Sequence, residues 1–207
     1  MYKLLTFGYN NSIILLERKV MSMKTKRYFK LILKPYNVIL KHFKGDGIRI
    51  SIGQKFCCFP QLEEKEIEIP IFENKKGRQA FYNKMLKCLK EFGIEETYSS
   101  ELLSFLHELG HIYTYNKINN IKYNIGTVLI QKIQAVFVNP KYLDFFYNLY
   151  FNLALEKNAD KWAMNFIKNN LDLVKEWDIM LTKNYQKVMP KFIDHMKYKT
   201  KIDLLAE

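Results

Sequence analysis

Two histidines four residues apart constrain the fold of this chain more than any other feature. They are His107 and His111 of HELGH, inside the segment ELLSFLHELGHIYTY from Glu101 to Tyr115. Apolar residues recur there at helical spacing, and Ser99 or Ser100 precedes the segment as an N-cap. Because residues four apart lie on one face of a helix, both imidazoles can point at one metal ion. The alternative is an ordinary helix with two surface or core histidines.

Two further residues of HELGH fit a metal centre. Glu108 lies about 100° around the helix axis from His107, outside the ion's coordination shell but beside its open position. There it can act as a general base on a water whose pKa the metal lowers. Gly110 costs about 1 kcal/mol relative to alanine in a helix interior. A glycine at this position is easier to understand if another segment passes close to it.

A catalytic zinc ion needs a third ligand from the protein. Two common completions fail, because Lys117 stands where one pattern has a histidine and Ile130 where another has an aspartate. His42 and His195 remain possible, although no motif surrounds either of them.

Glu156 is the better third ligand. It lies in LALEKNADKWAMNFI, one helical turn before Asp160, so the two carboxylates share a helix face. Glu156 can then bind the ion while Asp160 accepts a hydrogen bond from a ligand histidine and fixes its tautomer. Ala159 and Ala163 are small enough to let this helix approach the first one at Gly110. The alternative is a solvated helix face with two surface charges.

Together the two motifs make the chain similar to gluzincin-type metallopeptidases, and most similar to the ImmA/IrrE-like metallopeptidases of bacteria, phages and mobile elements. The second motif of that family runs E-x-x-A-(N/D)-x-(aromatic)-A-x-x and then two apolar residues. The matching residues here are Glu156, Ala159, Asp160, Trp162, Ala163, Phe166 and Ile167. The resemblance implies that His107, His111 and Glu156 bind zinc. It also implies that Glu108 is the catalytic base.

The resemblance further implies a zinc metalloendopeptidase whose protein or peptide substrate is a regulatory protein, such as a transcriptional repressor of a phage or mobile element. Peptide hydrolysis usually also needs a group that stabilises the oxyanion. The candidates are a histidine with its neighbouring aspartate and three tyrosines: His195 beside Asp194, Tyr113, Tyr123 and Tyr147. The alternative function is a zinc-binding, non-catalytic interaction module or nucleic-acid-associated module.

The expected fold class is α+β, a mostly helical zincin-like metallopeptidase domain with a small N-terminal sheet. Strands are expected at Ile48–Ile52, in KFCCF and at Lys65–Phe72, where apolar and polar residues alternate. Pro70 cannot donate to a ladder on both sides, so the third strand is expected at a sheet edge. An extended peptide could bind there by β-augmentation.

Helices are expected at four places, in addition to a polar loop over 117–126 and an apolar helix or strand over 128–138. The four are residues 77–93 closed by Gly93, Ser99 to about Asn116, Lys141 to about Asn169, and Leu171–Lys199 with a bend or break at Pro190. On the last helix, Glu176 and Asp178 are interpreted as surface charges.

Three domain parts are expected. Residues 1–45 form an N-terminal extension of uncertain structure. Within it, residues 24–43 are expected to be interrupted at Pro35 and to form a helix–turn–helix pair, two strands or a surface amphipathic segment. Residues 46–170 form the zincin-like domain, and residues 171–207 a C-terminal helical segment packed on it. Met21 or Met23 could also be the natural start.

Composition narrows the functional classes. The net charge is +12, but only four of the 33 basic residues are arginine, the usual tool for phosphate and base contacts, so nucleic acid is an unfavoured partner. No run of about 18 uncharged apolar residues predicts a membrane span, and the N-terminal apolar stretch is too short for a signal peptide. The three cysteines lack zinc-ribbon spacing and suggest reduced, buried thiols. A cytoplasmic protein is expected.

Overall fold

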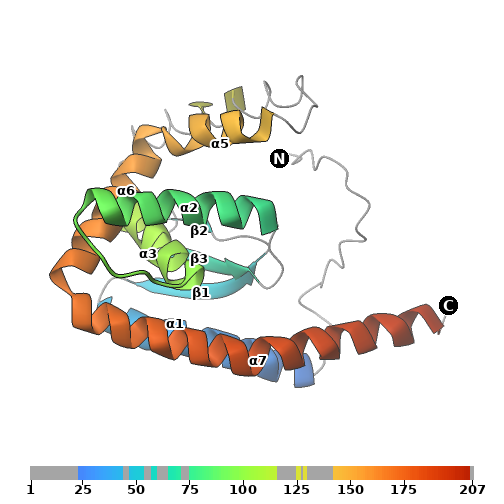
Figure 1. The fold of residues 1–207 in the computed structure, drawn as a ribbon. Coiled ribbons are helices and arrows are strands. Elements are labelled where there is room, and N and C mark those ends of the chain that lie inside the picture. Colours follow the sequence, from blue (N-terminus) through green and yellow to red (C-terminus); the bar gives the residue numbers. More distant parts are fainter. Residues whose placement is uncertain are drawn as a thin grey trace.

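The computed structural model describes residues 23–43, 47–53, 57–59, 65–70, 75–115, 125–126, 128–129 and 142–205. These residues form mostly helices and one small sheet, which confirms this coarse part of the expected fold (Figure 1). The elements in chain order are α1 (Met23–Leu40), a short 3-10 helix (Lys41–Phe43), β1 (Ile48–Gly53), β2 (Cys57–Phe59), β3 (Lys65–Pro70), α2 (Lys75–Glu91), α3 (Ser100–Tyr113), α5 (Leu143–Phe151), α6 (Ala154–Asn169) and α7 (Leu171–Leu205). None of the described helices combines the length and apolarity needed to cross a bilayer.

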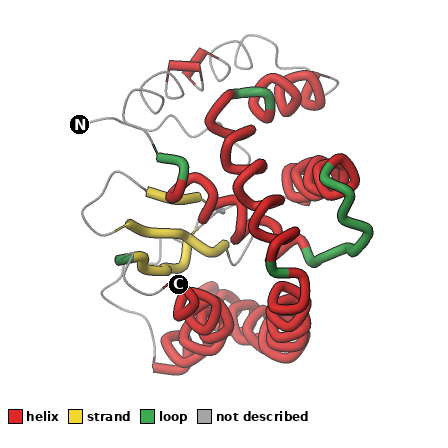
Figure 2. Tube along the Cα trace, turned by 90° about the vertical axis from the view of Figure 1, so that its left-hand side faces the viewer, coloured by secondary structure: helices red, strands yellow, loops and turns green. Residues whose placement is uncertain are grey.

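The helices lie around the sheet. Figure 1 shows α1 and α7 next to each other below the strands and α2 above them, and Figure 2 shows the three strands gathered at one side of the molecule. α3 contacts both β2 and β3, while α1 contacts β1 and runs along α7. The helix with the two histidines therefore lies between the sheet and the remaining helices.

β3 is the central strand of the sheet, in the order β1-β3-β2. The prediction that this strand lies at an edge is therefore wrong. Among the described residues, the antiparallel ladder with β2 covers Glu66 to Glu68, and Pro70 pairs with Gly53 of the parallel strand β1. Ile67 and Ile69 are buried, as the alternation predicts.

The two other predicted strands are confirmed as β1 and β2. Since β3 has a partner on each side, a peptide cannot add to it, and the predicted β-augmentation at this strand is not supported. Residues 71–72 of the predicted third strand lie outside the described residues.

α1 is part of the main core, although it falls within the predicted N-terminal extension. Tyr36 and Ile39 belong to the same buried cluster as Phe105 and Leu106 of α3. Ile32 packs in a second cluster with residues of α7. Residues 1–22 lie outside the described residues, and the expected boundaries at residues 45 and 170 stay predictions.

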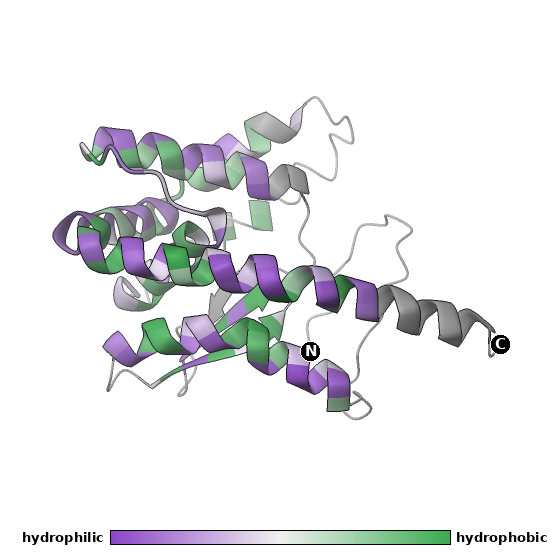
Figure 3. Cartoon of the chain, turned by 60° about the horizontal axis from the view of Figure 1, so that its bottom comes forward, coloured by the Kyte–Doolittle hydropathy of each residue, from purple (hydrophilic) through white to green (hydrophobic). Residues whose placement is uncertain are grey.

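The prediction that Pro35 interrupts this segment is wrong, because α1 continues through it. A proline inside a helix has no N–H to donate to the carbonyl four residues earlier, which here belongs to Leu31. That carbonyl instead accepts a hydrogen bond from the side-chain amide of Asn184 in α7, at 3.2 Å. A group from α7 thus replaces the missing helical bond. Figure 3 shows the two helices side by side, with hydrophilic residues spread along both.

α7 likewise continues through Pro190, so the helix is not broken there, and the alternative of a bend stays a prediction. Pro190 itself is exposed. Val188, Met189 and Phe192 around it are buried with Ile32 of α1. This packing holds the two halves of α7 against one partner helix.

The start of α3 agrees with the predicted N-cap. The hydroxyl of Ser99 accepts a hydrogen bond from the backbone N–H of Leu102, and Glu101 lies in the first turn, where it also pairs with Arg78 of α2. Asp178 of α7 accepts hydrogen bonds from the Ser99 backbone N–H at 2.9 Å and hydroxyl at 2.5 Å. The interpretation of Asp178 as a surface charge is therefore wrong, because it holds the beginning of α3.

The single helix predicted over 141–169 is two helices. α5 ends at Phe151, and the side-chain amide of Asn152 donates to the carbonyl of Asn148 at 2.7 Å, a local bond that competes with helix continuation. Leu153 is then extended, with ψ of 139°, and α6 begins at Ala154. The break places Glu156 in the first turn of a new helix.

Candidate metal centre

α3 and α6 cross at a contact between a glycine and an alanine. A Cβ atom built on Gly110 would lie 2.4 Å from the backbone oxygen of Ala159 and 2.9 Å from its Cα. Ala159 and Ala163 are fully buried. This confirms the predicted meeting point, and it brings the helix with both histidines within reach of Glu156.

Replacing Gly110 with alanine is expected to destabilise the protein by about 2–3 kcal/mol, because backbone atoms of Ala159 block the new methyl group. The sign of the change in unfolding free energy tests the close contact, because the same change from glycine to alanine at an unobstructed helix position stabilises the protein by about 1 kcal/mol. Denaturant unfolding measures the difference. Asn158→Ala, at an exposed position of α6, is the matched control and should be neutral or stabilising.

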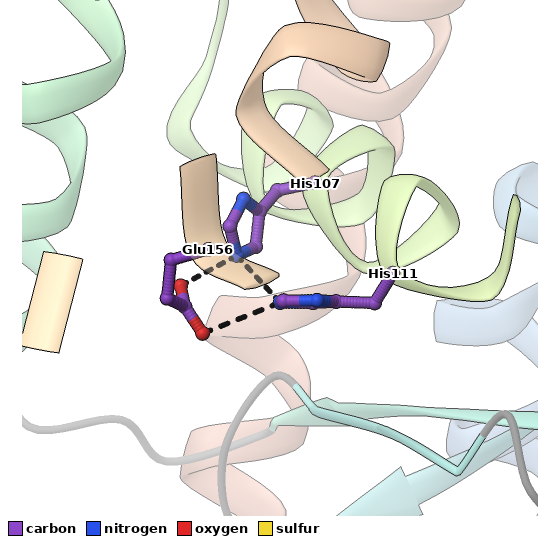
Figure 4. Close-up of side chains that lie close together, drawn as sticks. All are labelled: His107, His111 and Glu156. Atoms are coloured by element: carbon purple, nitrogen blue, oxygen red, sulfur yellow. Dashed lines mark hydrogen bonds and ion pairs between the residues drawn. The ribbon is translucent and has the colours of Figure 1, made fainter. Parts of the chain in front are cut away.

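Three buried side chains converge at this crossing, as predicted (Figure 4). One nitrogen or oxygen from each of His107, His111 and Glu156 lies within 4.8 Å of the others. The two Nε2 atoms are 3.0 Å apart. The carboxylate of Glu156 lies 3.1 Å from Nε2 of His107 and 3.4 Å from Nε2 of His111. Two imidazole nitrogens and one carboxylate therefore face one point.

Asp160 lies on the far side of the first histidine, as predicted. Its Oδ1 is 2.9 Å from Nδ1 of His107, and both groups are buried. A carboxylate at this distance accepts a hydrogen bond from the Nδ1–H group of the neutral ring, which leaves the lone pair of Nε2 directed at the point shared with His111 and Glu156. The arrangement thus selects the tautomer that a metal ligand requires.

The electrostatics of the cluster show how strongly its members interact. Burial lowers the pKa of His107, but its hydrogen bonds to Asp160 and Glu156 outweigh burial and raise the pKa to about 10. Burial raises the pKa of Glu156, but its bonds to His107 and His111 hold the value well below the ordinary range. Without a cation, the buried carboxylates therefore retain a proton on His107.

The donor set fits a zinc ion. Two imidazole nitrogens and one carboxylate oxygen are a common protein contribution to catalytic zinc, with a fourth position left for water or substrate. All three side chains are buried, and a shared cation would offset the cost of burying them together. Glu108 is also buried, at 8% exposure, next to His107 in the same helix. Its role as a base stays a prediction.

α2 contributes two residues that the sequence analysis missed. The ring of Phe81 packs edge-on against His107, with centroids 5.0 Å apart. The Nζ atom of Lys84 lies 2.6 Å from Oδ2 of Asp160. Lys84 could have been found from the sequence, because it places a charge inside the apolar stripe formed by Phe81, Met85 and Cys88.

The other histidines are not in the cluster. His195 forms a 3.1 Å contact from Nε2 to the hydroxyl of Thr25 and packs on Tyr28, at the contact between α7 and α1. His42 packs edge-on against Phe43 and Trp177. Among the described residues, the group suited to a metal ion includes neither of them.

The tyrosines proposed as oxyanion stabilisers have ring contacts of their own. Tyr113 stacks on Trp162, and Tyr147 stacks on Phe151. Tyr123 lies outside the described residues. An oxyanion role for Tyr113, Tyr147 or His195 stays a prediction.

Cys88 is a free, half-buried thiol near the cluster. Burial and the charge of Asp160 raise its pKa from 9.0 to about 11. Because only the thiolate reacts, alkylation at pH 8 should be about 100-fold slower than for an ordinary cysteine, and the rate should rise with pH up to about 11. The rate is measured in a Cys57→Ser/Cys58→Ser variant, with the same protein unfolded in guanidinium as control.

Comparisons with known proteins assign the chain to no family: no family model, curated protein or solved structure matches it. The likeness to ImmA/IrrE-like metallopeptidases therefore depends on HELGH and on the motif that begins at Glu156.

Proposed function

We propose that this protein is a zinc-dependent metallopeptidase that hydrolyses peptide bonds in a protein substrate. The observation that supports it best is the convergence of His107, His111 and Glu156, with Asp160 on the outer nitrogen of His107. A structural zinc site usually has four protein ligands, whereas the described residues bring three together, as in catalytic zinc sites that keep a position open for chemistry. The notable feature is that all three come from two helices in direct contact.

The residues of the proposed site have three different roles: metal binding, proton transfer and orientation of a ligand. His107, His111 and Glu156 would hold the zinc, which when bound supplies a Lewis acid for the scissile carbonyl and acidifies water. Glu108 takes the proton of the attacking water and returns it to the amine that leaves. Asp160 keeps the ring of His107 in one orientation throughout.

The substrate class follows from the resemblance of the two motifs. Within the ImmA/IrrE-like group such an enzyme cleaves regulatory proteins, so the proposed substrate is a repressor or similar regulator of a phage or mobile element. Since β3 is internal, its backbone is not the surface that receives the substrate.

Metal analysis and peptide hydrolysis together test the proposal. The purified chain should contain about one zinc ion and generate new N-termini in a mixture of proteome-derived peptides, detected by mass spectrometry. A chelator should stop the cleavage and added zinc should restore it. Stoichiometric zinc without any cleavage would instead support the non-catalytic zinc module. A chain that binds no zinc would contradict both.

A further inference from the structure

We propose that Lys84 is a positioning residue of the metal centre: its ion pair with Asp160 holds the carboxylate that orients His107, and so sets the affinity for the metal. This inference rests on the proposed zinc site. It assigns a function to a residue of α2, a helix that supplies no metal ligand.

The geometry around Asp160 is the first argument. Its two oxygens have different partners, because Oδ1 is 2.9 Å from His107 Nδ1 and Oδ2 is 2.6 Å from Lys84 Nζ. The side chains of Asp160 and Lys84 are only 9% and 14% exposed. Because His107 of α3 holds Oδ1 and Lys84 of α2 holds Oδ2, the carboxylate cannot rotate without losing one of these two partners. The direction of the His107 ring is thereby tied to α2.

Lys84 is itself held in place, which is unusual for a flexible side chain. Its Nζ atom lies over the ring of Phe151 at 4.7 Å and over that of Phe81 at 5.5 Å, both within the range of a cation–π contact. The Nζ atom is shielded from solvent. Phe81 in turn packs against His107. α2 therefore supports the ligand histidine in two ways, through a ring contact and through Asp160.

The buried negative charge around the site also favours a cation at the position of Lys84. Glu108, Glu156 and Asp160 are three buried carboxylates within two adjoining helices. A buried charge that loses its partner is strongly destabilising. Without Lys84, Asp160 would turn towards water and release His107 from its metal-binding orientation. The ammonium group thus keeps Asp160 buried beside the site.

The affinity for zinc tests the role directly, by competition with a chromophoric chelator. Lys84→Met keeps the length of the side chain and removes its charge. Loss of such an outer partner is expected to weaken zinc binding about 10- to 100-fold. Lys87→Met is the matched control, because Lys87 lies on the same helix and is 79% exposed. It should change the affinity less than about twofold.

A double-mutant cycle separates positioning from a general loss of stability. If Lys84 acts through Asp160, then Lys84→Met in an Asp160→Asn background should weaken zinc binding little further. Lys84→Arg, which retains the charge, should recover most of the affinity. Circular dichroism of each metal-free variant shows whether the fold is intact, and the absorption of bound Co²⁺ reports a change in coordination.

The outcomes distinguish this inference from the proposed function. Wild-type affinity in Lys84→Met, or additive effects in the cycle, would overturn the role of Lys84 while leaving the zinc site in place. A wild-type chain that binds no zinc would overturn both. Because affinity is measured rather than hydrolysis, the result does not depend on finding the substrate.

Discussion

Replacing Glu108 with glutamine is expected to lower the rate of peptide hydrolysis by about 10²–10⁴-fold, the usual contribution of a positioned general base. The amide cannot accept the proton of the attacking water, but it has nearly the same shape as the carboxylate. Zinc content should therefore stay at about one ion per chain. The two measurements are the cleavage rate of a peptide substrate and elemental analysis of the same preparation.

Glu176→Gln is the control for this variant, because Glu176 is an exposed glutamate on α7. It should hydrolyse peptides at the wild-type rate. If Glu108→Gln also retained full activity, Glu108 would not be the base. If it lost zinc as well as activity, the effect on hydrolysis would no longer identify a proton transfer.

Replacing His107 with alanine is expected to abolish stoichiometric zinc binding. The change removes one of the three proposed ligands and also the hydrogen-bond partner of Asp160. The stabilisation that zinc gives the folded state, about 4 kcal/mol when free zinc is 1,000-fold above its dissociation constant, should disappear with it. Elemental analysis and thermal unfolding with and without zinc measure both effects.

His111→Ala should give the same result, and His42→Ala provides the control, because His42 lies outside the cluster. Retention of one zinc ion per chain in both His107→Ala and His111→Ala would place the metal elsewhere. Circular dichroism in chelator shows whether the variants fold before metal is added.

Local patterns in the sequence were enough to predict the helix that carries His107 and His111 and the helix face that carries Glu156 and Asp160. The cap at Ser99, the glycine closure of α2 at Gly93 and the face shared by Glu156 and Asp160 are all set within a turn or two of chain. Gly93 does adopt a positive φ of 70°. The convergence of His107, His111 and Glu156 was predictable because helical spacing puts the two histidines on one face, and because Gly110 and Ala159 indicated where the second helix approaches.

Features that depend on distant segments could not be predicted in this way. The order of the strands depends on both β1 and β2 pairing with β3. The continuity of α1 depends on a hydrogen bond from Asn184, which is 153 residues away in sequence from Leu31. Lys84 reaches Asp160 only because α2 packs against α6. Each of these requires knowledge of which elements meet.

The bond from Asn184 to Leu31 also bears on the order in which the chain is completed during synthesis. The two residues are 153 positions apart, so at about 5–20 residues per second the amide follows the carbonyl by about 8–30 s. During that interval the turn of α1 around Pro35 lacks one of its hydrogen bonds, and the apolar side chain of Ile32 lacks its partners Val188 and Phe192. α1 therefore completes its packing and hydrogen bonding against α7 only after α7 has emerged from the ribosome.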